Sequence, residues 1–142
     1  MTENDRAFRE ISLQLLRQGQ SVRFRPGGHS MRPAINDGEA VLVEPVNPAR
    51  IRLGEIILYL FERGVIAHRV QSIEQSAVGL VFTTRGDTSH AADAPVAEAD
   101  VLGRVVAVER AGRRIDLAGR KARWRRSCRR AASQLKAWLL QR

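Results

Sequence analysis

The sequence is poor in cysteine and in lysine, and both shortages restrict its chemistry. Cys128 is the single cysteine, which excludes an internal disulfide and a cysteine-based zinc site. The two lysines, Lys121 and Lys136, lie near the C-terminus, and residues 1–116 contain none. A catalytic lysine therefore cannot come from residues 1–116.

Long apolar runs are absent as well. No window approaches the roughly 18 consecutive apolar residues that a membrane-spanning helix needs. Residues 1–20 are charged along their length and lack the apolar core of a secretory signal peptide. We therefore expect a cytoplasmic protein, unless a partner or the basic C-terminal segment holds it at the inner face of the membrane.

The excess positive charge is gathered at one end of the chain. The net charge is +9, yet residues 1–116 carry 15 arginines and 15 acidic residues and are neutral overall. Residues 117–142 carry nine basic residues and no acidic one. An argument for charge-driven binding to nucleic acid or to a membrane therefore concerns this C-terminal segment alone.

The pattern of apolar residues predicts a mainly β protein of one domain. Phe8, Ile11, Leu15 and Leu16 have the spacing of a short helix that ends near Gly19, and we expect its apolar face to pack on the body. Strands are predicted at 22–24, 40–46, 55–61, 65–73, 78–84, 101–110 and 113–117. Because no βαβ alternation is present, the sheet should be antiparallel and coiled or barrel-like.

Residues 119–142 predict a basic amphipathic helix. Trp124, Cys128, Ala131, Leu135 and Trp138 recur at helical spacing, with arginines on the other faces. The chain thus divides into an N-terminal helix (1–20), a β-rich domain (21–118) and this helical tail (119–142). The apolar stripe of the tail either packs on the protein's own body or binds an anionic membrane surface. Nucleic acid is the less favoured partner, because tryptophan suits a lipid interface better.

Three segments combine residues that can carry chemistry. Residues 28–33 read Gly-His-Ser-Met-Arg-Pro, and a serine beside tight-turning glycines can present its hydroxyl and its backbone N–H to one reacting carbon. His68 lies in the predicted strand at 65–73. Residues 84–87, Thr-Arg-Gly-Asp, follow another predicted strand, and Asp93 comes six residues after Asp87. Taken singly, each of these segments is more often a turn or a structural residue.

Taken in order, the segments resemble signal peptidase I and its relatives, the LexA-type self-cleaving repressors, over residues 21–108. The shared pieces are Gly-x-Ser-Met-x-Pro at 28–33, Gly-Glu at 54–55, His-Arg-Val at 68–70, Arg-Gly-Asp at 85–87 and Val-x-Gly-Arg-Val at 101–105. The resemblance implies the catalytic-core fold of that superfamily and the activity of a serine endopeptidase. Its substrate would be a polypeptide such as a leader or signal peptide.

The same resemblance implies a role for each candidate residue. Most bacterial signal peptidases use a lysine base, whereas the archaeal and endoplasmic-reticulum branch uses histidine, and His68 stands at that position. Ser30 is then the nucleophile and His68 its general base. Asp93 matches the aspartate that orients the histidine. Asp87 is the alternative, and would otherwise brace the loop that carries Asp93.

Two further residues are expected at the substrate. Met31 would form an apolar wall of the binding pocket. Gly28 stands where many signal peptidases carry a serine whose hydroxyl completes the oxyanion hole, so backbone N–H groups must serve here. We expect no cofactor and no metal; the weaker alternative would hold a metal between His29, His90 and an aspartate.

Two other function classes compete with a working endopeptidase. One is a LexA-like regulatory or self-cleaving module, which the 20 residues before the β body disfavour because they are too few for a helix-turn-helix. The other is a nucleic-acid-binding protein that acts through its arginine-rich tail.

Overall fold

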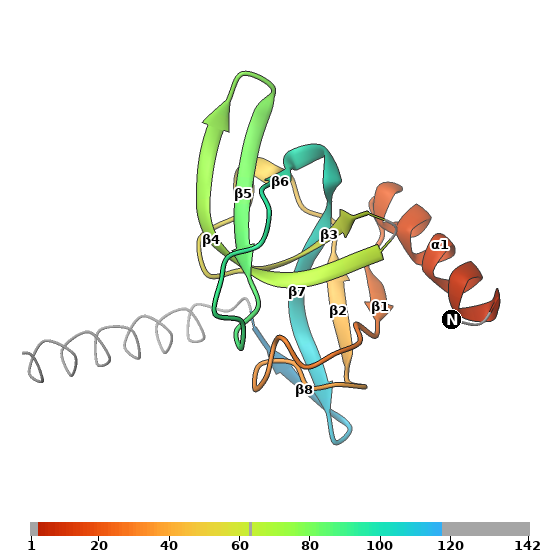
Figure 1. Ribbon diagram of the computed structural model, residues 1–142. Coiled ribbons are helices and arrows are strands. Elements are labelled where there is room, and N and C mark those ends of the chain that lie inside the picture. The colour runs from red at the N-terminus through yellow and green to blue at the C-terminus, as the bar shows by residue number, and fades with distance from the viewer. Residues whose placement is uncertain (1–2, 63, 118–142) are drawn as a thin grey trace, which may run out of the picture.

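Figure 1 shows the computed structural model, which describes residues 3–62 and 64–117. Within these residues, one α-helix precedes a sheet of eight strands. Helix α1 spans Glu3–Arg17, and the strands are β1 (Val22–Phe24), β2 (Ala40–Glu44), β3 (Ile56–Phe61), β4 (Gly64–Ser76), β5 (Gly79–Arg85), β6 (Val96–Ala97), β7 (Val101–Arg110) and β8 (Arg113–Asp116). Two 3-10 turns, η1 (Pro48–Arg50) and η2 (Glu98–Asp100), lie in the connections. The predicted mainly β fold with a short N-terminal helix is confirmed, while the predicted C-terminal helix lies outside the described residues.

All strand pairs of the sheet are antiparallel, and the sheet is open. The strand order is β1-β2-β7-β3-β4-β5-β6, with β8 added to β7. Register shifts between Leu42 and Val43, between Leu58 and Tyr59 and between Val70 and Ser72 interrupt the ladders. Because such irregularities bend a strand and increase its twist, the sheet coils, as Figure 1 shows for β3, β4 and β7.

Strand β3 divides the core into two clusters. Ile57 and Tyr59 of this strand pack with Val70 and Phe82, whereas Ile56 and Leu58 face the opposite cluster. Since side chains of a strand alternate between the two faces, a strand that is covered on both sides reads as a continuous apolar run. That burial accounts for the unbroken Ile-Ile-Leu-Tyr-Leu sequence of β3.

Helix α1 packs on the body through its C-terminal half only. Gly19 has a φ of 84°, and the N–H groups of Gly19 and Gln20 donate to the carbonyls of Leu16 and Leu15, which ends the helix in a Schellman motif. Leu16 is buried and Leu15 packs against the core. Phe8, however, is 58% exposed and Ile11 57%, so the expected packing of the whole apolar face is wrong for this half. Within the described part of the chain, no helix is both long enough and apolar enough to cross a membrane.

Some strand ends differ from the sequence prediction. Strand β2 ends at Glu44 instead of residue 46, because Pro45 has no N–H to continue the ladder. Strand β4 runs on to Ser76, where it still pairs with Gly79 of β5. The two-residue strand β6 was not predicted, because its pairing with Val81 and Phe82 is too short to leave a pattern.

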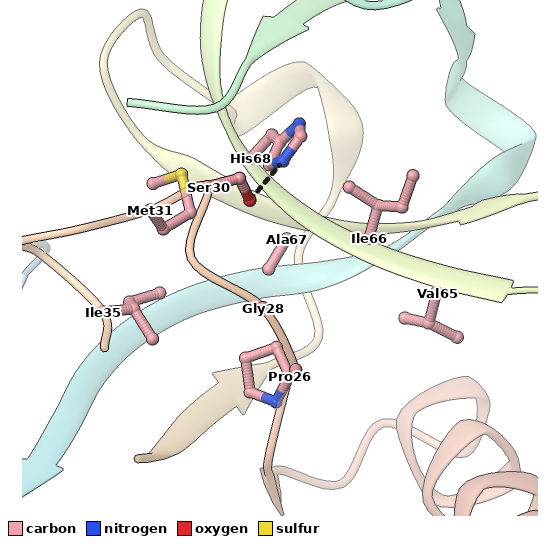
Figure 2. A pocket seen from close by; sticks show the side chains of 10 residues that line it. Pro26, Gly28, Ser30, Met31, Ile35, Val65, Ile66, Ala67 and His68 are labelled. Atoms are coloured by element: carbon pink, nitrogen blue, oxygen red, sulfur yellow. Dashed lines mark hydrogen bonds between the residues drawn. The ribbon is translucent and has the colours of Figure 1, made fainter. Parts of the chain in front are cut away.

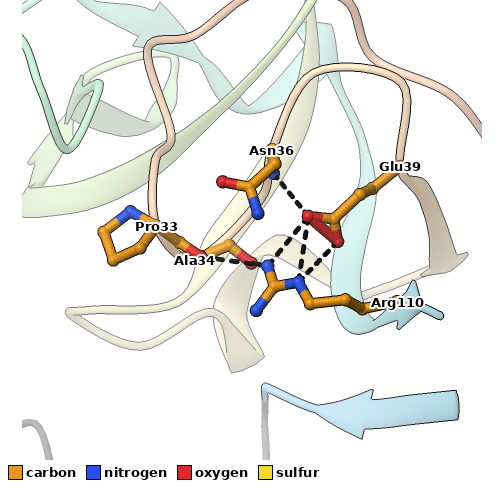
Figure 3. A network of polar contacts seen from close by, with 5 residues as sticks. All are labelled: Pro33, Ala34, Asn36, Glu39 and Arg110. Atoms are coloured by element: carbon orange, nitrogen blue, oxygen red, sulfur yellow. Dashed lines mark hydrogen bonds and ion pairs between the residues drawn. The ribbon is translucent and has the colours of Figure 1, made fainter.

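An ion-pair network holds the long connection between β1 and β2 against the end of β7 (Figure 3). The Arg110 guanidinium donates to both carboxylate oxygens of Glu39, at 2.9–3.0 Å. It also donates to the carbonyls of Pro33 and Ala34, at 3.0 and 3.3 Å. The hydrogen bond from Arg110 lowers the pKa of Glu39. The network fixes the segment that follows the Ser30 turn.

Candidate active site

Ser30 lies in the connection between β1 and β2, pressed against the loop that follows β5. The N–H of Thr88 donates to the Ser30 carbonyl at 2.9 Å, and the Thr88 hydroxyl donates to the His29 carbonyl at 3.3 Å. A Cβ added to Gly86 would lie 2.9 Å from both the Cβ and the carbonyl oxygen of Ser30. Only glycine fits this contact, so the Arg-Gly-Asp segment meets the Gly-His-Ser segment through its glycine.

His68 reaches Ser30 from strand β4. Its backbone is opposite Ile57 of β3, and its side chain is 12% exposed. The Nε2 atom lies 2.9 Å from Oγ of Ser30. The dashed line in Figure 2 marks this contact. These two residues are 38 positions apart in the sequence and are brought together by the pairing of β4 in the sheet.

Asp93 approaches the other side of the His68 ring. Its backbone N–H donates to the carbonyl of Thr84 at 2.8 Å, which folds the loop back toward β5. Its Oδ2 atom then lies 2.6 Å from Nδ1 of His68. A carboxylate can only accept, so Nδ1 carries the proton and Nε2 is left to accept from the Ser30 hydroxyl. The hydrogen-bond network thus assigns the tautomer that a general base requires.

Two buried hydroxyls hold the Asp93 carboxylate, and sequence reasoning missed both of them. The Thr84 hydroxyl donates to Oδ2 at 2.8 Å, and that of Tyr59 lies 3.3 Å from the same oxygen and 3.0 Å from Thr84 Oγ1. Thr84 is fully buried and Tyr59 is 1% exposed. Burial raises the pKa of Tyr59 to about 12, so its hydroxyl keeps its proton. Thr84 directly precedes the Arg-Gly-Asp segment, which was a usable signal; Tyr59 lies in an apolar strand and gave none.

Asp87 has a different set of contacts from Asp93. Its two carboxylate oxygens accept from Arg69 at 2.8 and 2.7 Å, and Arg69 also donates to the carbonyl of Gly54. Asp87 therefore joins the loop after β5 to strand β4 and to the turn before β3. The geometry brings Asp93, and not Asp87, to His68.

A pocket of about 240 Å³ opens beside Ser30 and His68 (Figure 2). Both predicted substrate residues, Met31 and Gly28, line it. Met31 is 5% exposed and packs into the core behind the pocket. The Gly28 N–H is engaged by Oδ1 of Asp37 at 3.0 Å. Among the described residues the Ser30 N–H has no acceptor, so it is free to donate to a ligand.

The two remaining histidines lie apart from this arrangement. His29 and His90 are both exposed. In residues 3–62 and 64–117, no three His, Cys, Asp or Glu side chains gather in a way that could hold a metal ion.

Comparison with known proteins gives one partial similarity. No family model matches the chain, and no solved structure matches it significantly. Signal peptidase I W of Bacillus subtilis is 32% identical over 75 residues, which cover 51% of this chain and 40% of that protein. The chain therefore spans well under half of this relative. The similarity supports a distant relationship with the signal peptidase I superfamily and, at that level, with serine peptidases.

Proposed function

We propose that the protein is a serine endopeptidase of the histidine-base type. The observation that carries the proposal is the continuous chain of hydrogen bonds from Ser30 through His68 to Asp93, which borders a pocket. A nucleophile, a base and an orienting carboxylate in this geometry define the Ser-His-Asp arrangement of hydrolases on several folds. The partial similarity to a signal peptidase I supports the same class of reaction.

The proposed reaction follows from the hydrogen bonds. Nε2 of His68 takes the hydroxyl proton of Ser30 as Oγ attacks the carbonyl carbon of the scissile peptide bond. The imidazolium that forms keeps its Nδ1–H on Asp93, and then gives the Nε2 proton to the leaving amine as the C–N bond breaks. Water then loses a proton to Nε2 of His68 as its oxygen adds to the ester carbonyl carbon. His68 returns that proton to Oγ of Ser30 as the ester C–O bond breaks and the acid product leaves.

The oxyanion formed in the first step can accept a hydrogen bond from the backbone N–H of Ser30, which has no acceptor among the described residues. Gly28 offers no hydroxyl, and its own N–H is held by Asp37. The loss of one oxyanion donor costs about 3–4 kcal/mol in other hydrolases. We therefore expect slow turnover.

Strand β4 offers an edge on which an extended polypeptide can bind. It pairs with β3 through Gly64–Arg69 but with β5 only from Arg69 onward, so within the described residues the second edge of 65–68 carries no strand. The pocket lies between this edge and the segment 26–28. A substrate added as a strand would bring its scissile bond to Ser30.

Substitution of the nucleophile tests the proposal. Wild-type protein should react with a fluorophosphonate probe and should cleave internally quenched alanine-based peptides. Ser30→Ala should lose labelling and nearly all cleavage, since the equivalent loss in other Ser-His-Asp hydrolases is roughly a millionfold in kcat. His68→Ala should lose nearly as much, with an unchanged circular dichroism spectrum in both variants. Comparable cleavage by Ser30→Ala would refute the proposal.

A further inference from the structure

A second groove, of about 430 Å³, adjoins the pocket beside Ser30. The two cavities share Pro26, Gly27 and Val65 as lining residues. Figure 2 shows Pro26 and Val65 at the side of the pocket that lies toward α1, away from Ser30. Phe8 and Arg9 of α1 form the far wall of the groove. An extended chain that leaves the pocket along the free edge of β4 would therefore enter the groove.

Of the residues that the structure describes, three arginines and no acidic residue line the groove. Arg23 is neutralised by Glu109, to which it donates at 2.8 and 2.7 Å. Within the described part of the chain, Arg25 donates only to the Gly38 carbonyl, at 2.7 Å. The hydrogen bond from Arg23 lowers the pKa of Glu109, and the nearby charge of Arg25 adds to this effect. Arg9 is half-buried, and none of the side chains that the structure describes hydrogen-bonds to it or forms an ion pair with it. Arg9 is therefore the cation most available to a ligand.

The aromatic residues of the groove suit a peptide chain. Phe24 is buried beneath the groove, and Phe8, at 58% exposed, stands beside Arg9 on the helix wall. A side chain with an apolar stem and a negatively charged end matches such a wall. A half-buried cation beside aromatic surface, in a groove that no described carboxylate lines, is complementary to glutamate or aspartate.

We propose that this groove is a specificity subsite that binds an acidic side chain of the polypeptide substrate through Arg9, with Arg25 in support. The inference rests on the proposed peptidase function. Val65 lies three residues before His68, and strands rise about 3.3 Å per residue, so the distance along the edge is roughly 10 Å. The acidic residue is accordingly expected about three or four positions from the scissile bond, on one side of it.

Peptides that differ at a single position test the subsite. Internally quenched alanine-based peptides would carry Glu, Gln or Lys at each position in turn on both sides of the cleaved bond. At the matching position, wild-type kcat/KM should be roughly two- to fivefold higher for Glu than for Gln, the range of a partly exposed ion pair. The preference should weaken as salt is raised, because the charges are screened.

Variants of equal charge change separate the groove from general electrostatics. Arg9→Gln should bring the Glu-to-Gln ratio close to one. Arg50→Gln removes the same charge from an exposed site outside the groove and should keep the wild-type ratio. Arg9→Glu should reverse the preference, so that the Lys peptide becomes better than the Glu peptide at the same position. A ratio that responds equally to Arg9→Gln and Arg50→Gln would overturn the proposal.

The failure of the subsite can be distinguished from the failure of the peptidase function. Cleavage by the wild type without a preference for Glu at any position would leave the peptidase standing and overturn the subsite. If no peptide is cleaved and no fluorophosphonate reacts, the proposed function fails. Whether the groove prefers an acidic side chain is then tested separately, by the fluorescence anisotropy of labelled Glu and Gln peptides with Ser30→Ala. Phosphatidylglycerol vesicles test whether a lipid headgroup binds the groove instead of a peptide. If they bind the wild type but not Arg9→Gln, and the peptides do not distinguish the two, a lipid headgroup occupies the groove and the proposal is wrong.

Discussion

The contact between Gly86 and Ser30 allows a sharp test of how the proposed nucleophile, Ser30, is positioned. In Gly86→Ala the new Cβ would lie 2.9 Å from the Cβ and from the carbonyl oxygen of Ser30, and 2.7 Å from Oγ of Ser89. Carbon atoms in contact are ordinarily about 3.5–4.0 Å apart. The Ser30 turn or the Gly86 turn must therefore move by roughly 0.6–1 Å.

That movement acts on a short hydrogen bond. Ser30 Oγ now lies 2.9 Å from Nε2 of His68, and a shift of this size would lengthen the contact beyond about 3.5 Å, where a hydrogen bond is lost. Misplacement of a reacting group by about 1 Å costs roughly 100-fold in rate. Overpacking by one methyl group costs about 1–3 kcal/mol in stability. We expect both losses in Gly86→Ala.

Gly103→Ala is the matched control. Its Cβ would lie 2.6 Å from the Glu44 carbonyl oxygen and 2.7 Å from Cγ1 of Val43, an overlap of similar size between β7 and β2. This variant should lose stability in urea but keep the wild-type kcat and fluorophosphonate labelling rate per folded molecule. If Gly86→Ala retains the same kcat as Gly103→Ala, then Gly86 does not position Ser30 and the reasoning is wrong.

Four other predictions follow from the same contacts and charges. Asp93→Asn should lower kcat by about 10⁴-fold, since asparagine favours the wrong histidine tautomer, and Asp87→Asn should lower it less; the reverse ranking would exchange their roles. Tyr59 is the single tyrosine, and its phenolate absorbance should titrate near 12 in the folded protein and near 10.0 in urea. Because the unfolded state loses that proton first, stability should fall between these pH values by about 1.4 kcal/mol per pH unit, and Tyr59→Phe should flatten the fall; a native titration near 10.0 would contradict this. Arg110→Gln should lower stability by about 1 kcal/mol, because Glu39 loses its partner, and urea unfolding at pH 7 would measure it. Removal of residues 118–142 should abolish binding to anionic vesicles at low salt, whereas unfolding of the truncated protein would mean that the tail packs on the body.

The sheet and the segments around Ser30 could largely be predicted because they depend on local signals. Alternation, turn residues and the absence of βαβ repeats indicated antiparallel strands. The order of the Gly-His-Ser, His-Arg-Val and Arg-Gly-Asp segments indicated Ser30, His68 and the two aspartates as candidate site residues. The lack of lysine in residues 1–116 excluded a lysine base there without any structure.

The choice between Asp87 and Asp93 could be made only in three dimensions. Both follow β5, and their spacing alone allows either to reach a histidine. The structure separates them through pairing with groups distant in sequence: Arg69 binds Asp87, while the Thr84 carbonyl and hydroxyl turn Asp93 toward His68.

What the sequence by itself determined is the antiparallel β character of the chain and the position of most strands along it, and it named the candidate site residues, because those inferences depend on residues adjacent in the chain. Tertiary structure alone decided which acid meets His68, that Tyr59 is buried beside it, and that Phe8 and Arg9 border a groove instead of packing on the body. Each of these facts depends on contacts between residues far apart in the sequence, formed when β3, β4 and β5 pair and α1 packs beside β1. Such contacts leave no periodic pattern in the chain.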